Sequence, residues 1–210
     1  CIRDRILTVL MAYAFTKPIP GRNFFRFLMV FTMYFGGGLI PTYLVVNKLG
    51  LLNTRWAMII PGACSVYNVL ITRTYFMNSI PDALQEAATL DGANSYQYLV
   101  RIVLPLSKPI LATIALFYAV DKWNEWWNSM LYINRMEMYP LQLILQSIIN
   151  TYQSATDRNI ASADALNRLK TFSMGIKMAA IVVTMLPIMC VFPFLQRFFV
   201  KGIMIGAVKG

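Results

Sequence analysis

The 210-residue chain is strongly apolar, with 58% hydrophobic and 13% charged residues and a mean hydropathy of +0.55. Soluble domains have about 45–50% apolar and about 25% charged residues, so a soluble protein with an unusually apolar core is the weaker alternative. The net charge is +10, but the 19 lysines and arginines are scattered singly. The chain therefore lacks the basic runs that are typical of nucleic-acid-binding proteins. Lysines and arginines that flank membrane spans account for the positive charge.

Long charge-free runs indicate membrane spans. Phe27–Asn47 has 21 residues, Met178–Gln196 has 19 and Trp56–Thr72 has 17, and a bilayer crossing takes roughly 20. The weaker runs Ile6–Thr16 and Pro109–Val120 bring the total to about five hydrophobic segments. We predict an all-α integral membrane protein, with one helical-bundle domain over residues 1–210.

The chain starts at Cys1, without an initiator Met or a cleavable leader sequence. We expect an incomplete N-terminus that lacks at least one span, rather than a mature lipoprotein. Cys64 and Cys190 lie in apolar runs, where buried and inert thiols are expected. The sequence contains no histidine and predicts no metal site, disulfide framework or cofactor.

The first half of the chain holds three of the predicted segments. The first ends at 17-KPIPGR-22, a loop because its prolines and glycine do not continue a helix; its cations indicate the cytoplasmic side. The second, about Phe24–Val46, contains 36-GGGLIP-41, which predicts a broken segment packed inside a bundle. The third is expected at about Arg55–Phe76.

Residues 79–105 interrupt the apolar pattern and are expected in the cytoplasm. Ser79 is the predicted cap of a first short helix, and Gly92 ends it because glycine adopts the left-handed conformation without steric cost. Asn94 or Ser95 caps a second helix, which Pro105 ends. Ile80, Leu84, Ala87 and Ala88 share one face of the first helix. Two short amphipathic helices of this kind are typical of a docking surface for another protein. They are equally typical of an amphipathic loop at the membrane interface.

The rest of the chain contains two further segments. The fourth runs from about Lys108 to Ile133 and includes 121-DKWNEWW-127; the fifth covers about Gly175–Phe198. Strict alternation places residues 134–173 outside the cell and the tail 197–210 inside. Among the aromatic residues of the fourth segment, an outer interfacial belt is expected from Trp126, Trp127 and Tyr132.

Residues 86–105 carry a specific motif. Glu86, Ala87 and Ala88 are followed after three residues by Gly92, then after nine by Ile102, then after one by Leu104 and Pro105. This pattern resembles the complete EAA motif of permease subunits from binding-protein-dependent ABC importers. The stretches 35-FGGGLIPTYL-44 and 140-PLQLIL-145 resemble the carbohydrate-importer subgroup that handles complex oligosaccharides and uronates.

The resemblance implies a type I importer permease with about five of an expected six spans. Its two short helices are then the coupling helices, which fit a cleft in a cytoplasmic ATPase subunit. Glu86 pairs there with a basic residue, and Gly92 permits the turn. The resemblance assigns the coupling contact to Glu86, Ala87, Ala88, Asp91, Gly92, Ile102, Leu104 and Pro105.

The implied partners are a second, non-identical permease, two ATPase subunits, and an extracytoplasmic binding protein that contacts residues 134–173 and delivers a sugar or oligosaccharide. The complex lies in the lipid of a prokaryotic cell membrane, as a multi-pass protein without nucleic acid. The sequence has no phosphate-binding loop, so ATP hydrolysis is expected in separate chains. The tail 197–210 either reaches the ATPase or is a solvated end.

Polar residues inside apolar segments are candidates for the substrate pathway, because they are costly in lipid and face a cavity or a partner. Trp123 is also suited to stacking on a sugar ring. Helix–helix packing is the alternative for each candidate. The candidates are Asn68, Tyr118, Asp121, Trp123 and Asn124.

Two other function classes compete with this interpretation. A membrane enzyme would need a reactive constellation, but the chain has no histidine and offers only Glu86 and Asp91 as an acid pair. A stand-alone secondary transporter or channel usually has internal repeats and ionisable residues at the midplane, and no convincing repeat is found. Dependence of uptake on ATP separates the two transport classes.

Overall fold

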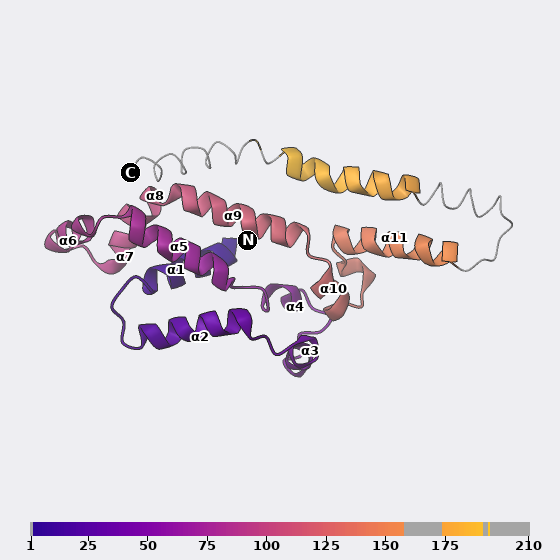
Figure 1. Cartoon of the computed structure of the whole chain (residues 1–210), viewed down its shortest axis with the longest axis horizontal. Helices are drawn as coiled ribbons and strands as arrows, with labels where there is room; N and C mark the ends of the chain where they lie inside the picture. Colours follow the sequence, from indigo (N-terminus) through magenta and orange to yellow (C-terminus); the bar gives the residue numbers. More distant parts are fainter. Residues whose placement is uncertain (1, 158–173, 191–192, 194–210) are drawn as a thin grey trace. The chain divides into compact units, whose positions relative to one another are not determined.

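The computed structural model describes residues 2–157, 174–190 and 193, and all its regular structure in these ranges is helical (Figure 1). The prediction of an all-α fold is confirmed. The chain divides into two compact units. Of the described residues, unit 1 contains 2–42 and 59–119, and unit 2 contains 43–58, 120–157, 174–190 and 193.

Unit 1 is built around two packed helices, α1 (Ile2–Ala14) and α5 (Val66–Ser79), with α9 (Lys108–Trp123) contributing to the same core. In lipid, helix association depends on close packing and interhelical hydrogen bonds rather than on water exclusion. The buried core side chains from these three helices are Val9, Ala12, Val69, Phe76, Ile110 and Ile114.

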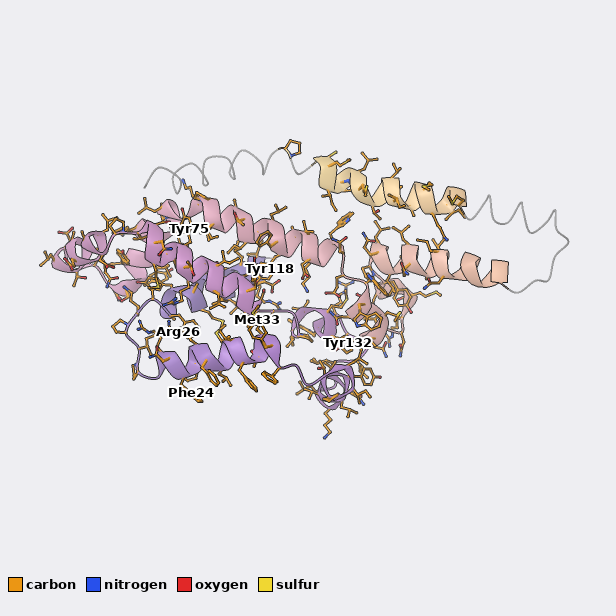
Figure 2. The ribbon with its side chains drawn as sticks, in the orientation of Figure 1. Phe24, Arg26, Met33, Tyr75, Tyr118 and Tyr132 are labelled. Carbon is orange, nitrogen blue, oxygen red and sulfur yellow. The ribbon has the colours of Figure 1, made fainter. Side chains whose placement is uncertain are left out.

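Helix α2 (Arg22–Tyr34) contacts α5 but has no buried residue. Its phenylalanines are exposed, and they stack along the helix with centroid distances of 6.2 Å for Phe27–Phe31 and 4.6 Å for Phe31–Phe35. Figure 2 shows Phe24 on the side of α2 that faces away from α5. Among the residues that the structure describes, α2 is therefore not packed inside a bundle, and its apolar surface is exposed.

The predicted break in the second apolar segment is confirmed. Helix α2 ends at Tyr34, Gly38 has a φ of 87°, and α3 spans Leu39–Lys48. The third predicted segment is wrong as a single helix: α4 spans only Trp56–Ile59, and α5 starts at Val66. Pro61 and Gly62 lie in the intervening turn, where neither residue favours a continuing helix.

The fourth predicted segment, Lys108–Ile133, is wrong as a single helix. Helix α9 ends at Trp123, where the Asn124 side chain donates to the carbonyl of Val120 at 3.0 Å. Helix α10 (Trp127–Tyr132) follows, and the Glu125 carboxylate accepts from the backbone N–H of Asn128 at 3.3 Å. Local side-chain bonds of this kind compete with helix continuation, so the chain breaks between the two helices.

Unit 2 has a smaller core in which Tyr132 is 4% exposed and stacks on Tyr43 with 6.2 Å between ring centroids. The expected place of Tyr132 in an interfacial aromatic belt is therefore wrong. Asn53 connects two segments of this core. Its backbone is left-handed, with a φ of 57°, a conformation that asparagine tolerates. Its N–H donates to the Tyr132 carbonyl at 2.9 Å, and its side-chain oxygen accepts from the Asn134 N–H at 2.6 Å.

The second half of unit 2 contains the short 3₁₀ helix η2 (Met136–Met138), α11 (Leu141–Asp157) and a helix over Met174–Cys190. The predicted loop 134–173 thus contains a long helix, α11, and residues 158–173 lie outside the described residues. The tail 197–210 also lies outside them.

Among the described residues, the candidate membrane crossings are pairs of helices joined by a bend. No single helix there combines the required length and apolar composition, but two bent pairs do so together: α2 with α3, and Ser95–Leu106 with α9, the latter bent by 82°. The number of spans stays a prediction. Cys64 and Cys190 are both exposed within this chain, so the expectation of buried thiols is wrong.

Candidate coupling site

The motif residues 86–105 start in α6 (Asp82–Leu90), which is separated from α5 by two extended residues, Ile80 and Pro81. Ile80 has φ −113° and ψ 111°, the conformation that a following proline imposes. The N-cap of α6 is Pro81, with no side-chain cap, and Ser79 is the last residue of α5. The predicted capping role of Ser79 is therefore wrong, because α5 extends further than the sequence pattern indicated.

The turn at Gly92 forms as predicted. Gly92 has a φ of 73°; its N–H donates to Thr89 at 3.0 Å, and the Ala93 N–H donates to Ala88 at 2.9 Å. This pair of bonds is the Schellman motif, which satisfies carbonyls at the end of a helix. Apart from its chain neighbours, no atom of the described residues lies within 4 Å of where a Gly92 Cβ would stand. The position therefore requires glycine for its backbone conformation and not for space.

Asn94 caps the second short helix, α7 (Ser95–Tyr98), as one of the two predicted candidates. Asn94 and Gln97 form a reciprocal capping box, in which the Gln97 side chain accepts from the Asn94 N–H at 3.0 Å. Each bond satisfies a donor that the helix start would otherwise leave without a partner. The turn from α6 into α7 is thus specified by local hydrogen bonds on both sides of Gly92.

Pro105 does not end the second helix, contrary to the prediction. The chain continues from α7 through a π-helical turn, η1 (Leu99–Val103), into α8 (Leu104–Leu106), and Leu104 is helical with φ −61° and ψ −45°. A proline clashes with the carbonyl four residues before it, and the wider π-turn immediately ahead of Pro105 relieves that crowding. The helix ends instead at Ser107, before α9.

We call α6, Gly92 and α7 the coupling hairpin (residues 82–98). Its inner side joins the unit 1 core through Ala88 and Tyr98, and Ile102 and Leu104 pack against the same core further along. Of the predicted apolar face, only Ala88 is buried; Leu84 and Ala87 are exposed.

The outer side of the coupling hairpin carries the motif acids and two unpaired apolar groups. Glu86 and Asp91 are exposed. Leu90 is 90% exposed and Tyr96 is 70% exposed. A hairpin fixed at its root, with two carboxylates and two large exposed apolar side chains at its surface, has the composition of a protein docking surface.

Two of the pathway candidates lie in the helix packing of unit 1. The Tyr118 hydroxyl is hydrogen-bonded to Thr8 Oγ1 at 2.6 Å and accepts from the Ser65 N–H at 3.2 Å, and Figure 2 places Tyr118 on the inner side of α9. Asn68 is buried on α5, where its carbonyl accepts from the Thr72 hydroxyl at 2.7 Å. The Tyr118–Thr8 bond joins α9 to α1, as the packing alternative predicts, whereas the Asn68 bond lies within α5.

The remaining pathway candidates belong to unit 2. Asp121 and Asn124 are exposed, and Trp123 Nε1 donates to the Thr184 carbonyl at 3.3 Å. Lys122 Nζ lies 3.9 Å from the Asp121 carboxylate and 3.6 Å from that of Glu125. Glu125 was not among the predicted residues: it pairs with Lys122 and accepts from the first turn of α10, and only its spacing to Lys122 and Asn128 signals this.

A family model described as "Binding-protein-dependent transport system inner membrane component" matches residues 2–205. Protein LplC of Bacillus subtilis (strain 168) is 44% identical over 204 residues, covering 97% of this chain and 68% of LplC. The polygalacturonan/rhamnogalacturonan transport system permease protein YtcP of the same organism is 42% identical over 212 residues, with 97% and 70% coverage.

A solved structure of a bacterial ABC transporter involved in the import of the acidic polysaccharide alginate has a TM-score of 0.79 and 35% identity, and the match covers 94% of this chain and 69% of that chain. The chain belongs to the family of binding-protein-dependent transport system inner membrane components. It is thus an ABC importer permease with the type I importer fold, a membrane subunit and not an enzyme. The ATPase, the second permease and the binding protein are separate subunits of such a system.

Proposed function

We propose that this permease imports oligosaccharides that contain acidic sugars, and that the coupling hairpin is its contact with the ATPase. The substrate class is supported by relatives that are named for polygalacturonan/rhamnogalacturonan and for alginate, both at 35% identity or more. The single observation that carries the coupling role is the exposed hairpin itself, in which the motif acid Glu86 and the apolar Leu90 lie on the outer surface.

The hairpin suits the transmission of force for two reasons. Its turn is closed by backbone bonds at 2.9 and 3.0 Å and by a capping box, so it resists local bending. Its inner side is buried in the core formed by α1, α5 and α9. A movement of the docked ATPase therefore reaches these helices directly, as a two-state membrane bundle driven by ATP requires.

The topology that follows from this role has residues 79–105 and 197–210 in the cytoplasm and residues 134–173 outside, facing the binding protein. A non-identical second permease and two ATPase subunits complete the assembly. For the pathway, the exposed Asp121 and Asn124 and the half-buried Trp123 are stronger candidates than Asn68 and Tyr118, because the latter two are buried within unit 1.

ATP-driven uptake of an oligogalacturonate in proteoliposomes tests the proposal. The complex is assembled with its ATPase and binding protein, and Glu86→Lys is compared with Glu86→Gln. We expect the reversed charge to abolish uptake while binding-protein docking is retained, and the neutral isostere to reduce uptake less. Uptake that continues without ATP and without the ATPase would contradict the coupling role and favour a stand-alone transporter.

A further inference from the structure

The root of the coupling hairpin holds a lysine between two tyrosines. Lys17 Nζ lies 5.0 Å from the ring centroid of Tyr13 and 5.0 Å from that of Tyr98. The two rings are 6.5 Å apart and inclined by 38°, and the Tyr13 hydroxyl donates to the carbonyl of Ser95 at 3.1 Å. Tyr13 belongs to α1 and Tyr98 to α7, so this group joins the first helix to the hairpin.

The backbone that carries Lys17 is ordered by its own turn. The Lys17 N–H donates to Ala14 at 3.1 Å, and its carbonyl accepts from the Ile19 N–H at 2.9 Å. The Arg22 guanidinium reaches the same carbonyl at 3.4 Å. The ammonium is therefore presented from a fixed loop between α1 and α2, and not from a freely moving chain.

The surroundings strengthen the contact between the cation and the rings. Tyr98 is 5% exposed, Lys17 is half-buried, and burial lowers the pKa of Lys17 through loss of hydration. A partly dehydrated cation interacts more strongly with an aromatic face than a hydrated one. Within the described ranges Lys17 makes no salt bridge, so its electrostatic partners there are the two tyrosine rings.

A cavity of about 150 Å³ lies next to this cluster. It separates part of α6 from the ends of α1 and α5, and its lining includes Thr16, Phe76, Ile80 and Gln85. The hairpin is thus incompletely packed against the helices on this side. Its attachment there depends on a small number of contacts, among which the Tyr13–Lys17–Tyr98 cluster spans α1 and α7.

We propose that Lys17 is a positioning residue for transport: it holds the coupling hairpin to α1, so that movement of the hairpin moves the first helix with it. The inference rests on the proposed coupling role of the hairpin. It assigns to Lys17 a function in force transmission that is separate from any effect of its charge on membrane topology.

The experiment measures substrate molecules imported per ATP hydrolysed, in the reconstituted complex with its binding protein. Lys17→Met, Tyr98→Leu and the double variant form a cycle, with Lys17→Arg and Tyr98→Phe as matched controls that keep the cation and the ring. We expect each disruptive single variant to lower the ratio by about threefold to tenfold. The double variant is expected to be no worse than the more damaged single variant, and both controls to stay near wild type.

Three results would overturn the inference: a wild-type ratio in Lys17→Met, multiplication of the two single effects in the double variant, or equal loss in Lys17→Met and Lys17→Arg. If Lys17→Met alone fails to assemble with the ATPase while Lys17→Arg assembles, the inference is supported, because the cation then places the docking surface. Failure of the coupling proposal gives a different result, namely uptake by the wild-type complex that does not require ATP.

Discussion

The coupling hairpin and the candidate pathway residues differ in what determines their structure. Every feature of the hairpin turn is local: the Schellman bonds at Gly92 and the Asn94–Gln97 capping box join residues at most five positions apart. Two of the pathway candidates are held by distant partners, Thr8 for Tyr118 and Thr184 for Trp123. A docking element can thus be encoded in a short motif, whereas a pathway depends on the assembled bundle.

The largest effect on uptake is expected from a substitution at Gly92, which tests whether the hairpin turn depends on local backbone conformation. Gly92→Val places a β-branched side chain at a φ of 73°, and the left-handed conformation costs about 1–2 kcal/mol or more for such a residue. We expect ATP-driven uptake to fall at least tenfold, because the hairpin no longer presents Glu86 and Leu90 together. Hydrogen exchange over residues 82–98 should rise in the same variant.

Gly92→Asn is the matched control for this change. Asparagine enters the left-handed region more readily than valine, and there is open space at the site. Uptake in Gly92→Asn should therefore stay within a few-fold of wild type. Equal loss in the asparagine and valine variants would show that the side-chain volume matters, contrary to a purely conformational requirement.

A smaller effect is expected at the capping box. Asn94→Ala removes the side-chain acceptor at the start of α7, which costs about 0.5–2 kcal/mol of local stability. Uptake should fall moderately, by about threefold to tenfold, and hydrogen exchange should increase in α7 but not in α9. Asn94→Ser keeps an acceptor and should be close to wild type. Increased exchange in α9 as well would mean that the hairpin is not a local unit.

The difference between local and long-range contacts also explains which features could be predicted from the sequence. Gly92, and Asn94 as one of two cap candidates beside Ser95, could be predicted because a left-handed C-terminus and an N-cap have residue preferences of their own. The break at Pro61–Gly62 was missed because hydropathy indicated one charge-free run. The helix through Pro105 was missed because it depends on the π-turn over Leu99–Val103, a backbone geometry with no strong sequence signal.

The burial of individual side chains was harder to predict than the helices. Tyr132 was expected at an interface on composition alone, but the left-handed Asn53 fixes its carbonyl in the core of unit 2. Lys17 was interpreted only as a topological cation, because its position over Tyr98 joins residues 81 positions apart in the sequence. Contacts of this kind follow from tertiary structure and have no local pattern.

The smallest effect is expected from a substitution at Tyr118, which tests the candidate pathway residues and not the coupling hairpin. Tyr118→Phe removes the hydroxyl that joins Thr8 and the Ser65 N–H to α9. Interhelical hydrogen bonds in membranes contribute about 0.6 kcal/mol on average, so the thermal midpoint of the purified complex should fall slightly. The apparent KM for substrate should not change, because the hydroxyl is engaged within the chain. The matched control is Phe117→Leu, because Phe117 is an exposed neighbour on α9.

A KM that rises severalfold in Tyr118→Phe with unchanged thermal stability would place Tyr118 on the substrate pathway and not in the packing of unit 1.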